Sequence, residues 1–391
     1  PSPATPFFLT RIRSVSGQQY RVAETAFPGE SACNVKATSY QIGMQPDSLQ
    51  PVDRLDRPLR DLRISVTDRC NFRCSYCMPR EVFGKNYQFL KQSQLLSFEE
   101  ITRLVRLFAA FGVSKLRLTG GEPLLRREIE KLVAMLSGVD GIRDIAMTTN
   151  ASLLTMQRVA DLRSAGLNRL NISLDALDPK VYAIVNEVNT PLEDVLNGID
   201  NALSADFSAI KINMVVQKGV NESEILPMVE RYRNSGAILR FIEFMDVGNH
   251  NQWSLQQVLT ARQIIEMIHA RYPLEALDAN YQGEVAKRWR FQDGGGEVGV
   301  IASISQPFCR DCSRARLSAI GELYTCLFAT SGFDLRSLVR AGYGDGIIAN
   351  KLAEIWQSRA DRYSEERFVR SPEPADSNRR SAKVEMSYIG G

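Results

Sequence analysis

Short runs of apolar and β-branched residues alternate with amphipathic stretches from residue 62 onward. The runs that predict strands are Leu62–Val66, Lys115–Leu118, Arg143–Thr148, Arg169–Leu174, Ile210–Val216 and Leu239–Phe244. The stretches with apolar residues at helical spacing are Phe98–Phe111, Arg127–Leu136, Thr155–Ala165, Leu192–Leu203 and Ser223–Asn234. Ser97 and Glu100 form the capping-box pattern that is typical of a helix start. Strands separated by helices indicate parallel βαβ units with right-handed crossovers.

This alternation predicts an α/β fold, but it does not distinguish an open doubly wound sheet from a partial barrel. Polar or adaptable groups follow the predicted strands: a cysteine-rich loop after the first, Gly120–Pro123 after the second, Thr148–Asn150 at the third, Ser173–Asp175 at the fourth, and Arg240 and Met245 around the sixth. In barrels of this kind, reactive groups lie at the C-terminal ends of the strands. We therefore expect these groups to line one mouth.

After about Gly248 the alternation weakens. The pattern there predicts helices at Val258–Arg271, Leu335–Ala341 and Gly346–Arg359, and a hairpin over Ala286–Ala302 with Gly294–Gly296 at its turn. We divide the chain into an N-terminal extension (1–50), a core (51–248) and a C-terminal region (249–391).

Composition narrows the class of protein. The chain has 391 residues, of which 44% are hydrophobic and 24% charged, as in globular proteins of one large or two moderate domains. Its formal net charge of +3 is too small to argue for a nucleic-acid partner. No apolar run approaches the ~20 residues of a membrane span, so we expect no membrane partner either.

The first fifty residues differ from the rest. They are rich in Ser, Thr, Ala, Pro and Gln and poor in acids, and they lack a clear amphipathic period. We interpret them as a disordered or irregular extension without a catalytic part. An organelle presequence is the alternative, since Arg11, Arg13 and Arg21 outweigh the acids. We favour the cytoplasm as the location of the protein, with the mitochondrial matrix as the alternative if the extension is a presequence.

Three cysteines near the start of the core have the spacing C-x3-C-x2-C: Cys70, Cys74 and Cys77. Thiolates this close on one loop can converge on a single inorganic centre. Structural zinc is nearly always closed by four protein ligands, and both histidines, His250 and His269, lie far downstream. Three thiolates instead leave one position of a four-iron cluster open to a substrate or cofactor. This pattern, with Tyr76 before the last cysteine, resembles the radical S-adenosylmethionine (SAM) superfamily.

Gly120-Gly121-Glu122-Pro123 directly follows the predicted strand at 115–118 and resembles the GGEP turn of that superfamily. Two glycines let the backbone come close to a ligand, because they carry no Cβ. Glu122, together with local carbonyl groups, could hold an ammonium group. A lone Gly-Gly pair would indicate only a turn, but after the cysteine loop it supports a SAM site.

A second triad, Cys309, Cys312 and Cys326, has the spacing C-x2-C-x13-C. Taken alone, it fits zinc and an iron–sulfur cluster equally well. Arg310, Arg314 and Arg316 are interleaved with it, and Arg63, Arg117, Lys211 and Arg240 lie on the predicted strands. Guanidinium groups bind phosphates in a bidentate way, so these cations favour a polyanionic substrate.

Together these motifs are similar to those of the GTP 3',8-cyclase family. The resemblance is carried by Asp68–Pro79, the GGEP turn, Arg240–Met245, the pattern C-x2-C-x-R-x-R-x9-C and the terminal Gly390-Gly391, and it runs essentially from Asp56 to Gly391. It implies an open partial (β/α)6 TIM-like barrel over 51–248 and a C-terminal extension over 249–391 that binds an auxiliary cluster and GTP. The Gly-Gly tail is expected to enter the active site.

The resemblance also implies an activity and its residues. The implied enzyme is a lyase that uses a 5'-deoxyadenosyl radical to convert GTP to (8S)-3',8-cyclo-7,8-dihydroguanosine 5'-triphosphate, the first step of molybdenum cofactor biosynthesis. Cys70, Cys74 and Cys77 would hold one 4Fe–4S cluster, which serves catalysis, and Cys309, Cys312 and Cys326 a second. Tyr76, Gly121, Ser173 and Met245 match SAM-binding positions. Arg63, Arg117, Thr148, Lys211, Arg314 and Arg316 match GTP-binding positions.

The implied partners are an electron donor such as flavodoxin or ferredoxin, the downstream cyclic pyranopterin monophosphate synthase, and a second copy of the chain in a homodimer. One departure from the family pattern is Ala151, where glycine is more usual, so that backbone freedom beside Thr148 is reduced. Two alternatives stay open: a radical SAM enzyme that acts on a peptide, and a zinc-stabilised scaffold that binds nucleotides or RNA without catalysis.

Overall fold

The computed structural model describes residues 50–187, 190–281, 283–367 and 383–390, and the backbone of residues 9–13 and 18–22. The chain divides into two compact units, residues 1–49 and 50–391. In the first unit, β1 (Leu9–Arg13) pairs with β2 (Gln18–Val22) in antiparallel register. The rest of the predicted irregular extension lies outside the described residues. Within the described part of the chain, no helix is long and apolar enough to cross a membrane.

The second unit is built on one twelve-stranded sheet that does not close on itself. Its centre consists of consecutive parallel strands: β3 (Asp61–Ser65), β4 (Lys115–Thr119), β5 (Asp144–Thr149), β6 (Arg169–Ser173), β7 (Ala209–Val216) and β8 (Ile238–Glu243). The sequence predicted all of these strands, with boundaries that differ by at most one residue. The predicted open partial barrel is confirmed.

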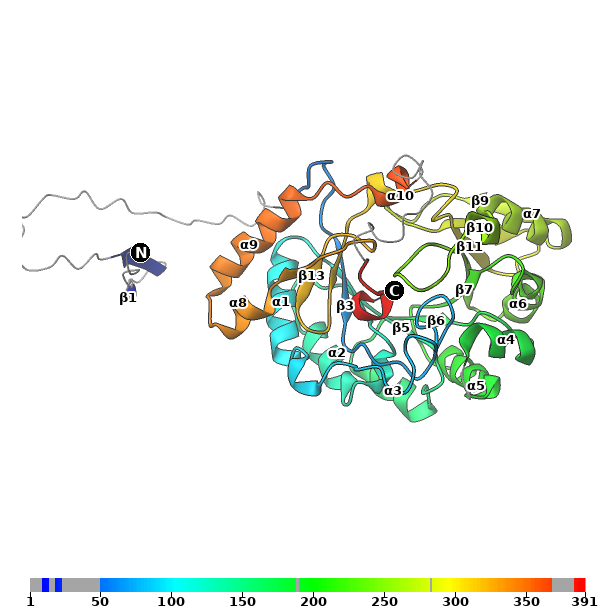
Figure 1. Cartoon of the computed structure of the whole chain (residues 1–391), viewed down its shortest axis with the longest axis horizontal. Coiled ribbons are helices and arrows are strands. Elements are labelled where there is room, and N and C mark those ends of the chain that lie inside the picture. The colour runs from blue at the N-terminus through cyan, green and yellow to red at the C-terminus, as the bar shows by residue number, and fades with distance from the viewer. Residues whose placement is uncertain are drawn as a thin grey trace, which may run out of the picture. The chain divides into compact units, whose positions relative to one another are not determined.

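Helices cover the outer side of this sheet, in an arc from α1 to α7 (Figure 1). Their bounds are α1 (Phe98–Ala110), α2 (Ile129–Ser137), α3 (Met156–Ser164), α4 (Pro179–Asn186), α5 (Leu192–Leu203), α6 (Ile225–Tyr232) and α7 (Ala261–Arg271). The capping box is confirmed, since Ser97 Oγ accepts from Glu100 N and Glu100 accepts from Ser97 N. The sequence analysis did not predict α4. This helix is only eight residues long, and Asp178 caps its start.

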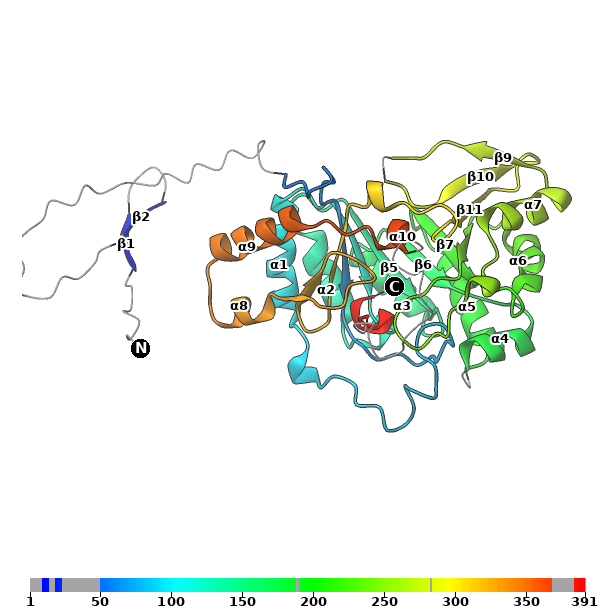
Figure 2. The same cartoon turned by 45° about the horizontal axis from the view of Figure 1, so that its top comes forward.

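The C-terminal region extends the sheet at both ends. Beside β8 lie β11 (Glu297–Ile301), β10 (Lys287–Phe291) and β9 (Leu274–Leu277), and beside β3 lie β12 (Arg314–Leu317), β13 (Glu322–Tyr324) and β14 (Phe333–Asp334). The predicted hairpin is β10 and β11. Figure 2 shows the β9–β11 end next to α7. The sequence analysis missed β9, β12, β13 and β14.

The remaining elements are helices, and the sequence predicted two of them, α8 and α9. They are α8 (Arg336–Arg340), α9 (Asp345–Ser358), α10 (Tyr363–Glu366), α11 (Met386–Ile389) and the 3-10 helices η1 (Gln92–Gln94), η2 (Pro123–Leu125), η3 (Glu222–Glu224), η4 (Leu255–Gln257) and η5 (Cys309–Asp311). In both views α8 and α9 lie beside α1, and the C-terminal end lies on the inner side of the sheet (Figures 1 and 2).

Alternation along the strands separates the core from the site. On β3, Leu62 and Ile64 are fully buried in the hydrophobic core, and Arg63 points to the opposite face because successive side chains alternate. The outer face of the sheet therefore packs against the helices through apolar residues. The inner face collects the charged and polar residues, and it is there that a site can form.

Ala151, between β5 and α3, has a φ of 63°, a left-handed conformation that favours glycine. Its methyl group is fully buried beside Gly198 of α5. Replacing Ala151 by Gly relieves about 1–2 kcal/mol of backbone strain. It also loses about 0.8 kcal/mol from the buried methyl group, and it raises the entropy of the unfolded chain, which destabilises the fold by a similar amount. These contributions nearly cancel.

We therefore expect Ala151→Gly to change the free energy of unfolding by less than about 1 kcal/mol. Ala151→Val, whose branched Cβ is unfavourable at positive φ, should cost more than about 2 kcal/mol. Denaturant unfolding of both variants measures this. Equal destabilisation by Gly and Val would contradict the assignment of strain.

Candidate active site

The first cysteine loop follows β3 at the C-terminal edge of the sheet. Cys77 N and Met78 N both donate to Cys74 O, at 2.9 and 2.8 Å, which closes a tight turn. The Arg73 guanidinium donates to Cys70 O at 2.8 Å and to two further carbonyl oxygens. The loop is thus fixed by its own backbone and by one buried cationic fork.

The GGEP turn packs directly against this loop. Gly121 N donates to Thr67 O and Glu122 N to Arg69 O, both at 2.8 Å. A Cβ on Gly121 would collide with Arg69 O and would lie 2.9 Å from Cys70 N. The close approach that the sequence predicted for a ligand is therefore also an approach to the cysteine loop itself.

Glu122 has a structural role that the sequence did not indicate. Its carboxylate accepts hydrogen bonds from Leu124 N, Thr149 Oγ1 and Asn150 N, at 2.7–3.0 Å. Burial raises the pKa of Glu122 to about 7, although these hydrogen bonds oppose the shift. The side chain joins the GGEP turn to the end of β5.

Tyr76 and Ser173 lie at the same mouth. Tyr76 Oη donates to Asp175 Oδ2 at 2.8 Å, and Asp175 Oδ1 accepts from Val215 N at 2.8 Å. Burial raises the pKa of Asp175 to about 6. Cys74 Sγ donates to Asn186 Oδ1 at 3.1 Å. Asn186 was not predicted, and no local pattern in the sequence indicates it.

The second triad lies opposite the first because β12 pairs with β3 in parallel register. Cys309 and Cys312 lie at η5, just before β12, and Cys326 follows β13. All six cysteines line one cavity, in which about 2330 Å³ is free of protein atoms, part of it open to solvent. Tyr76, Gly121, Thr148, Ser173 and Met245 line the same cavity.

The sulfur atoms suit a multi-iron group better than a single ion. Among the described residues, no three His, Cys, Asp or Glu side chains lie close enough together to hold one metal ion. A closed zinc site needs its ligands around one ion, whereas a cubane cluster spreads its thiolates over separate irons. Cys70 Sγ accepts from Phe72 N at 3.3 Å, and Cys312 Sγ accepts from Arg314 Nη2 at 3.4 Å. Such donors stabilise thiolate ligands, so the residues fit iron–sulfur clusters.

The two triads differ in charge. Burial and then Glu122 raise the pKa of Cys70 to about 12, and burial and then Asp175 raise the pKa of Cys74. At the second triad, Arg314 and Arg359 overcome burial and lower the pKa of Cys312 to about 6. Cys326 of the second triad differs from Cys312, because burial and then Asp361 raise its pKa to about 11. Buried carboxylates thus lie near the first triad, whereas at the second triad the guanidinium groups act on Cys312.

Three arginines from neighbouring strands form a row across the inner face of the sheet. Arg316 on β12 is paired with Arg63 on β3, and Arg63 with Arg117 on β4. Burial and repulsion from Arg117 and Arg316 lower the pKa of Arg63. Burial and Arg240 lower the pKa of Arg117 to about 10, and burial and Arg314 lower that of Arg316 to about 9. A bound polyanion would offset this repulsion.

The other predicted contacts are distributed around this row. Thr148 Oγ1 is buried and has no hydrogen-bond partner in the described ranges, so it is available to a ligand. Arg240 lies 3.9 Å from Glu284, an acid that the sequence analysis did not mark. Lys211 on β7 is not among the described residues that line the cavity. Burial and Arg240 lower the pKa of Lys211 to about 7.

The C-terminal tail reaches this cavity. Met386 of α11 lines it, and the Gly390 carbonyl accepts a hydrogen bond from Arg316 Nη1. Gly390 has a φ of 76°, and a Cβ there would collide with the side chain of Thr119. Glycine is therefore required at this position on two grounds. Gly391 lies outside the described residues.

Comparisons with known proteins agree with this architecture. The model of the Radical SAM superfamily matches residues 64–232, and that of Molybdenum Cofactor Synthesis C matches residues 237–365. The GTP 3',8-cyclase of Acidothermus cellulolyticus is 52% identical over 361 residues, which cover 88% of this chain and 99% of that protein. The chain belongs to the GTP 3',8-cyclase family. A relative from Xanthomonas axonopodis pv. citri is also 52% identical, over 87% of this chain and 98% of its own length.

A solved structure supports the fold. Streptococcus suis SuiB bound to S-adenosylmethionine superposes with a TM-score of 0.53 at 16% identity, covering 75% of this chain and 67% of SuiB. The chain therefore shares the radical SAM fold. Membership of that superfamily also supports SAM and iron–sulfur clusters as cofactors.

The contact between the GGEP turn and the cysteine loop gives a test. Gly121→Ala must displace Arg69 and Cys70, at a cost of about 1–3 kcal/mol, and should lower the iron bound by the first triad. Gly138→Ala is the matched control, because a Cβ there would come no closer than 3.7 Å to its neighbours. Iron content and thermal unfolding report both effects. Full iron loading of Gly121→Ala would contradict the tight contact.

Proposed function

We propose that this chain is a radical SAM GTP 3',8-cyclase. It converts GTP to (8S)-3',8-cyclo-7,8-dihydroguanosine 5'-triphosphate in the first step of molybdenum cofactor biosynthesis. The observation that carries the proposal is the shared cavity, in which two cysteine triads face a row of arginines. The two relatives at 52% identity are GTP 3',8-cyclases, which supports the same reaction.

Two 4Fe–4S clusters are part of this proposal. Cys70, Cys74 and Cys77 hold the first, and Cys309, Cys312 and Cys326 hold the second. When bound together with SAM, the first cluster would supply the electron for reductive cleavage of SAM. Tyr76, Gly121, Ser173 and Met245 line the cavity and would bind SAM, and Asp175 positions Tyr76 through its hydrogen bond.

The chain's own residues bind and orient the nucleotide. Arg63, Arg117 and Arg316 provide adjacent guanidinium forks that suit phosphate oxygens, and Arg314 lies at the second triad. Thr148 offers its hydroxyl group, which has no hydrogen-bond partner among the described residues. Burial and Arg240 lower the pKa of Lys211 to about 7, and a bound polyanion would favour its charged form. Holding ribose and guanine between the two triads brings the reacting carbon atoms together, which lowers the entropic part of the barrier.

The wider organisation follows from the same proposal. Residues 51–248 form the radical SAM core and 249–391 the region that binds the auxiliary cluster and GTP. An electron donor such as flavodoxin or ferredoxin supplies electrons, cyclic pyranopterin monophosphate synthase consumes the product, and the chain forms a homodimer.

Anaerobic reconstitution tests the two centres separately. The wild type should bind roughly eight iron and eight sulfide ions and form 5'-deoxyadenosine from SAM in the presence of GTP and a reductant. Cys74→Ala should bind about half as much iron and form no 5'-deoxyadenosine. Cys312→Ala should lose the other half and still cleave SAM. Zinc without sulfide would favour the scaffold alternative, and SAM cleavage by Cys74→Ala would refute the assignment of the first triad.

The arginines can be tested through GTP binding. In the double variant Arg314→Gln and Arg316→Gln, the loss of two charge-assisted contacts should weaken GTP binding by at least about 100-fold. Its first cluster should remain intact. Arg310→Gln is the matched control on the same loop, since Arg310 is exposed. Equilibrium binding of GTP measures the effect, and an unchanged affinity would place the phosphates elsewhere.

A further inference from the structure

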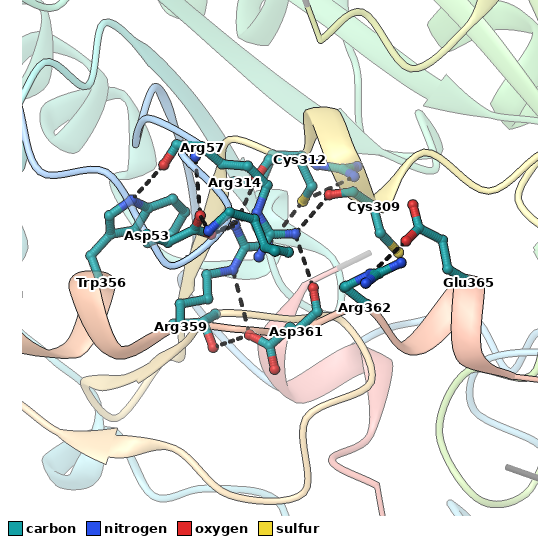
Figure 3. Close-up of polar contacts among 12 residues, drawn as sticks. Asp53, Arg57, Cys309, Cys312, Arg314, Trp356, Arg359, Asp361, Arg362 and Glu365 are labelled. Carbon is teal, nitrogen blue, oxygen red and sulfur yellow. Dashed lines mark hydrogen bonds and ion pairs between the residues drawn. The ribbon is translucent and has the colours of Figure 1, made fainter.

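Two buried arginines, from segments near the start and near the end of the second unit's sequence, donate hydrogen bonds to the second cysteine loop. Arg57 precedes β3 and Arg359 ends α9, and their side chains are only 2% and 1% exposed. We call the pair the arginine clamp. Figure 3 shows both guanidinium groups converging on Cys309 and Cys312. Neither arginine belongs to the row that faces the nucleotide.

The clamp contacts both the backbone and a sulfur atom. Arg359 Nη1 donates to Cys312 O at 2.7 Å, and its Nη2 donates to Cys312 Sγ at 3.2 Å. Arg57 Nη1 donates to Cys309 O at 2.7 Å and to Asp361 O at 2.9 Å. Arg57 Nη2 is buried, and its residue lines the cavity, yet that nitrogen has no hydrogen-bond partner among the residues described.

Asp53 holds the clamp in place. Its fully buried carboxylate accepts from Arg57 Nε at 2.6 Å and from Arg359 Nη1 at 3.1 Å. Trp356 adds further restraint, because its indole donates to Arg57 O at 3.0 Å and its ring lies 4.6 Å from the Arg359 guanidinium carbon. The two cations are thus preorganised before any cluster is bound.

The buried positive and negative charges of the arginine clamp do not cancel. Two buried guanidinium groups face one buried carboxylate, that of Asp53. Asp361 pairs with Arg359 at 3.4 Å, but its side chain is 35% exposed and its charge is partly screened by water. Buried charge is costly unless it is paired. A thiolate or cluster sulfide at the cavity side supplies the missing negative charge.

A purely structural tether would need only the bonds to carbonyl oxygens. The additional bond from Arg359 to Cys312 Sγ bears on the centre itself, since hydrogen bonds to sulfur and nearby positive charge stabilise the reduced, more negative state of an iron–sulfur cluster.

We propose that Arg359, positioned by Asp53 and assisted by Arg57, raises the reduction potential of the iron–sulfur centre at the second triad. The inference rests on the proposed function, because it requires that centre to be present. Arg359 is a positioning residue, because it donates to Cys312 and acts on the cluster through that cysteine.

The test is a redox titration of the reconstituted full chain, followed by electron paramagnetic resonance, in the Cys74→Ala background so that only the second centre is observed. Arg359→Gln should favour the oxidised form about tenfold at a given potential, which lowers the midpoint by ~59 mV for one electron. Asp53→Asn removes the negative charge but keeps an amide oxygen that can accept from the two guanidinium groups, so Arg359 stays in place and the midpoint should shift upward. Opposite signs for the two variants would not result from structural damage alone.

Matched variants complete the design. Arg54→Gln is the control, since Arg54 is exposed and lies next to Asp53 in the sequence; its midpoint should equal the wild type's. Arg359→Lys keeps the charge but loses the planar fork, and its midpoint should lie between those of wild type and Arg359→Gln. If Arg359→Gln fails to bind iron, Arg359→Lys decides the question.

The outcomes separate the inference from the function on which it rests. A wild type that binds about four irons overturns the two-cluster function and the inference with it. Two loaded centres with an unchanged midpoint in the Arg359 variants overturn the inference alone. A downward shift in Asp53→Asn would also refute it, because the carboxylate would then not oppose the clamp.

Discussion

Like-charge repulsion among one buried and two half-buried arginines is the constraint on which the inner face of this sheet depends. Arg316, Arg63 and Arg117 occupy paired positions on three adjacent strands, and each has a pKa lowered by burial and by its cationic neighbours. Burial of apolar residues on the outer face, such as Leu62 and Ile64 against the helices, offsets the free energy of this repulsion. Such a surface suits an anion with several charged oxygen atoms.

The pairing of β12 with β3 creates both the row and the cavity. Without it, Arg316 would not stand beside Arg63, and the second triad would lie away from the first. The same register brings the tail to the site, because α11 lies at the inner face and the Gly390 carbonyl accepts from Arg316. This single strand pairing therefore brings together the row of arginines, the two cysteine triads and the C-terminal tail.

The local sequence pattern predicted the central parallel strands and most of the helices. Each of these elements is either a run of apolar residues or a stretch with an amphipathic period. The strand β12 was missed, since its sequence Arg-Ala-Arg-Leu alternates charged with apolar residues over only four positions. In the site, the cysteines were found from their spacing. Asp53 and Arg359 could not be found in this way, because they meet across 306 positions of sequence.

The charges around the two triads explain how one cavity can serve two purposes. Carboxylates near the first triad disfavour extra negative charge there. Arg314 and Arg359 donate to Cys312 Sγ and favour negative charge at that position of the second triad. Since both sets of charges are buried, water screens them little, and the difference acts across the whole cavity. The protein therefore distinguishes two sets of three cysteines by the charged side chains that surround them.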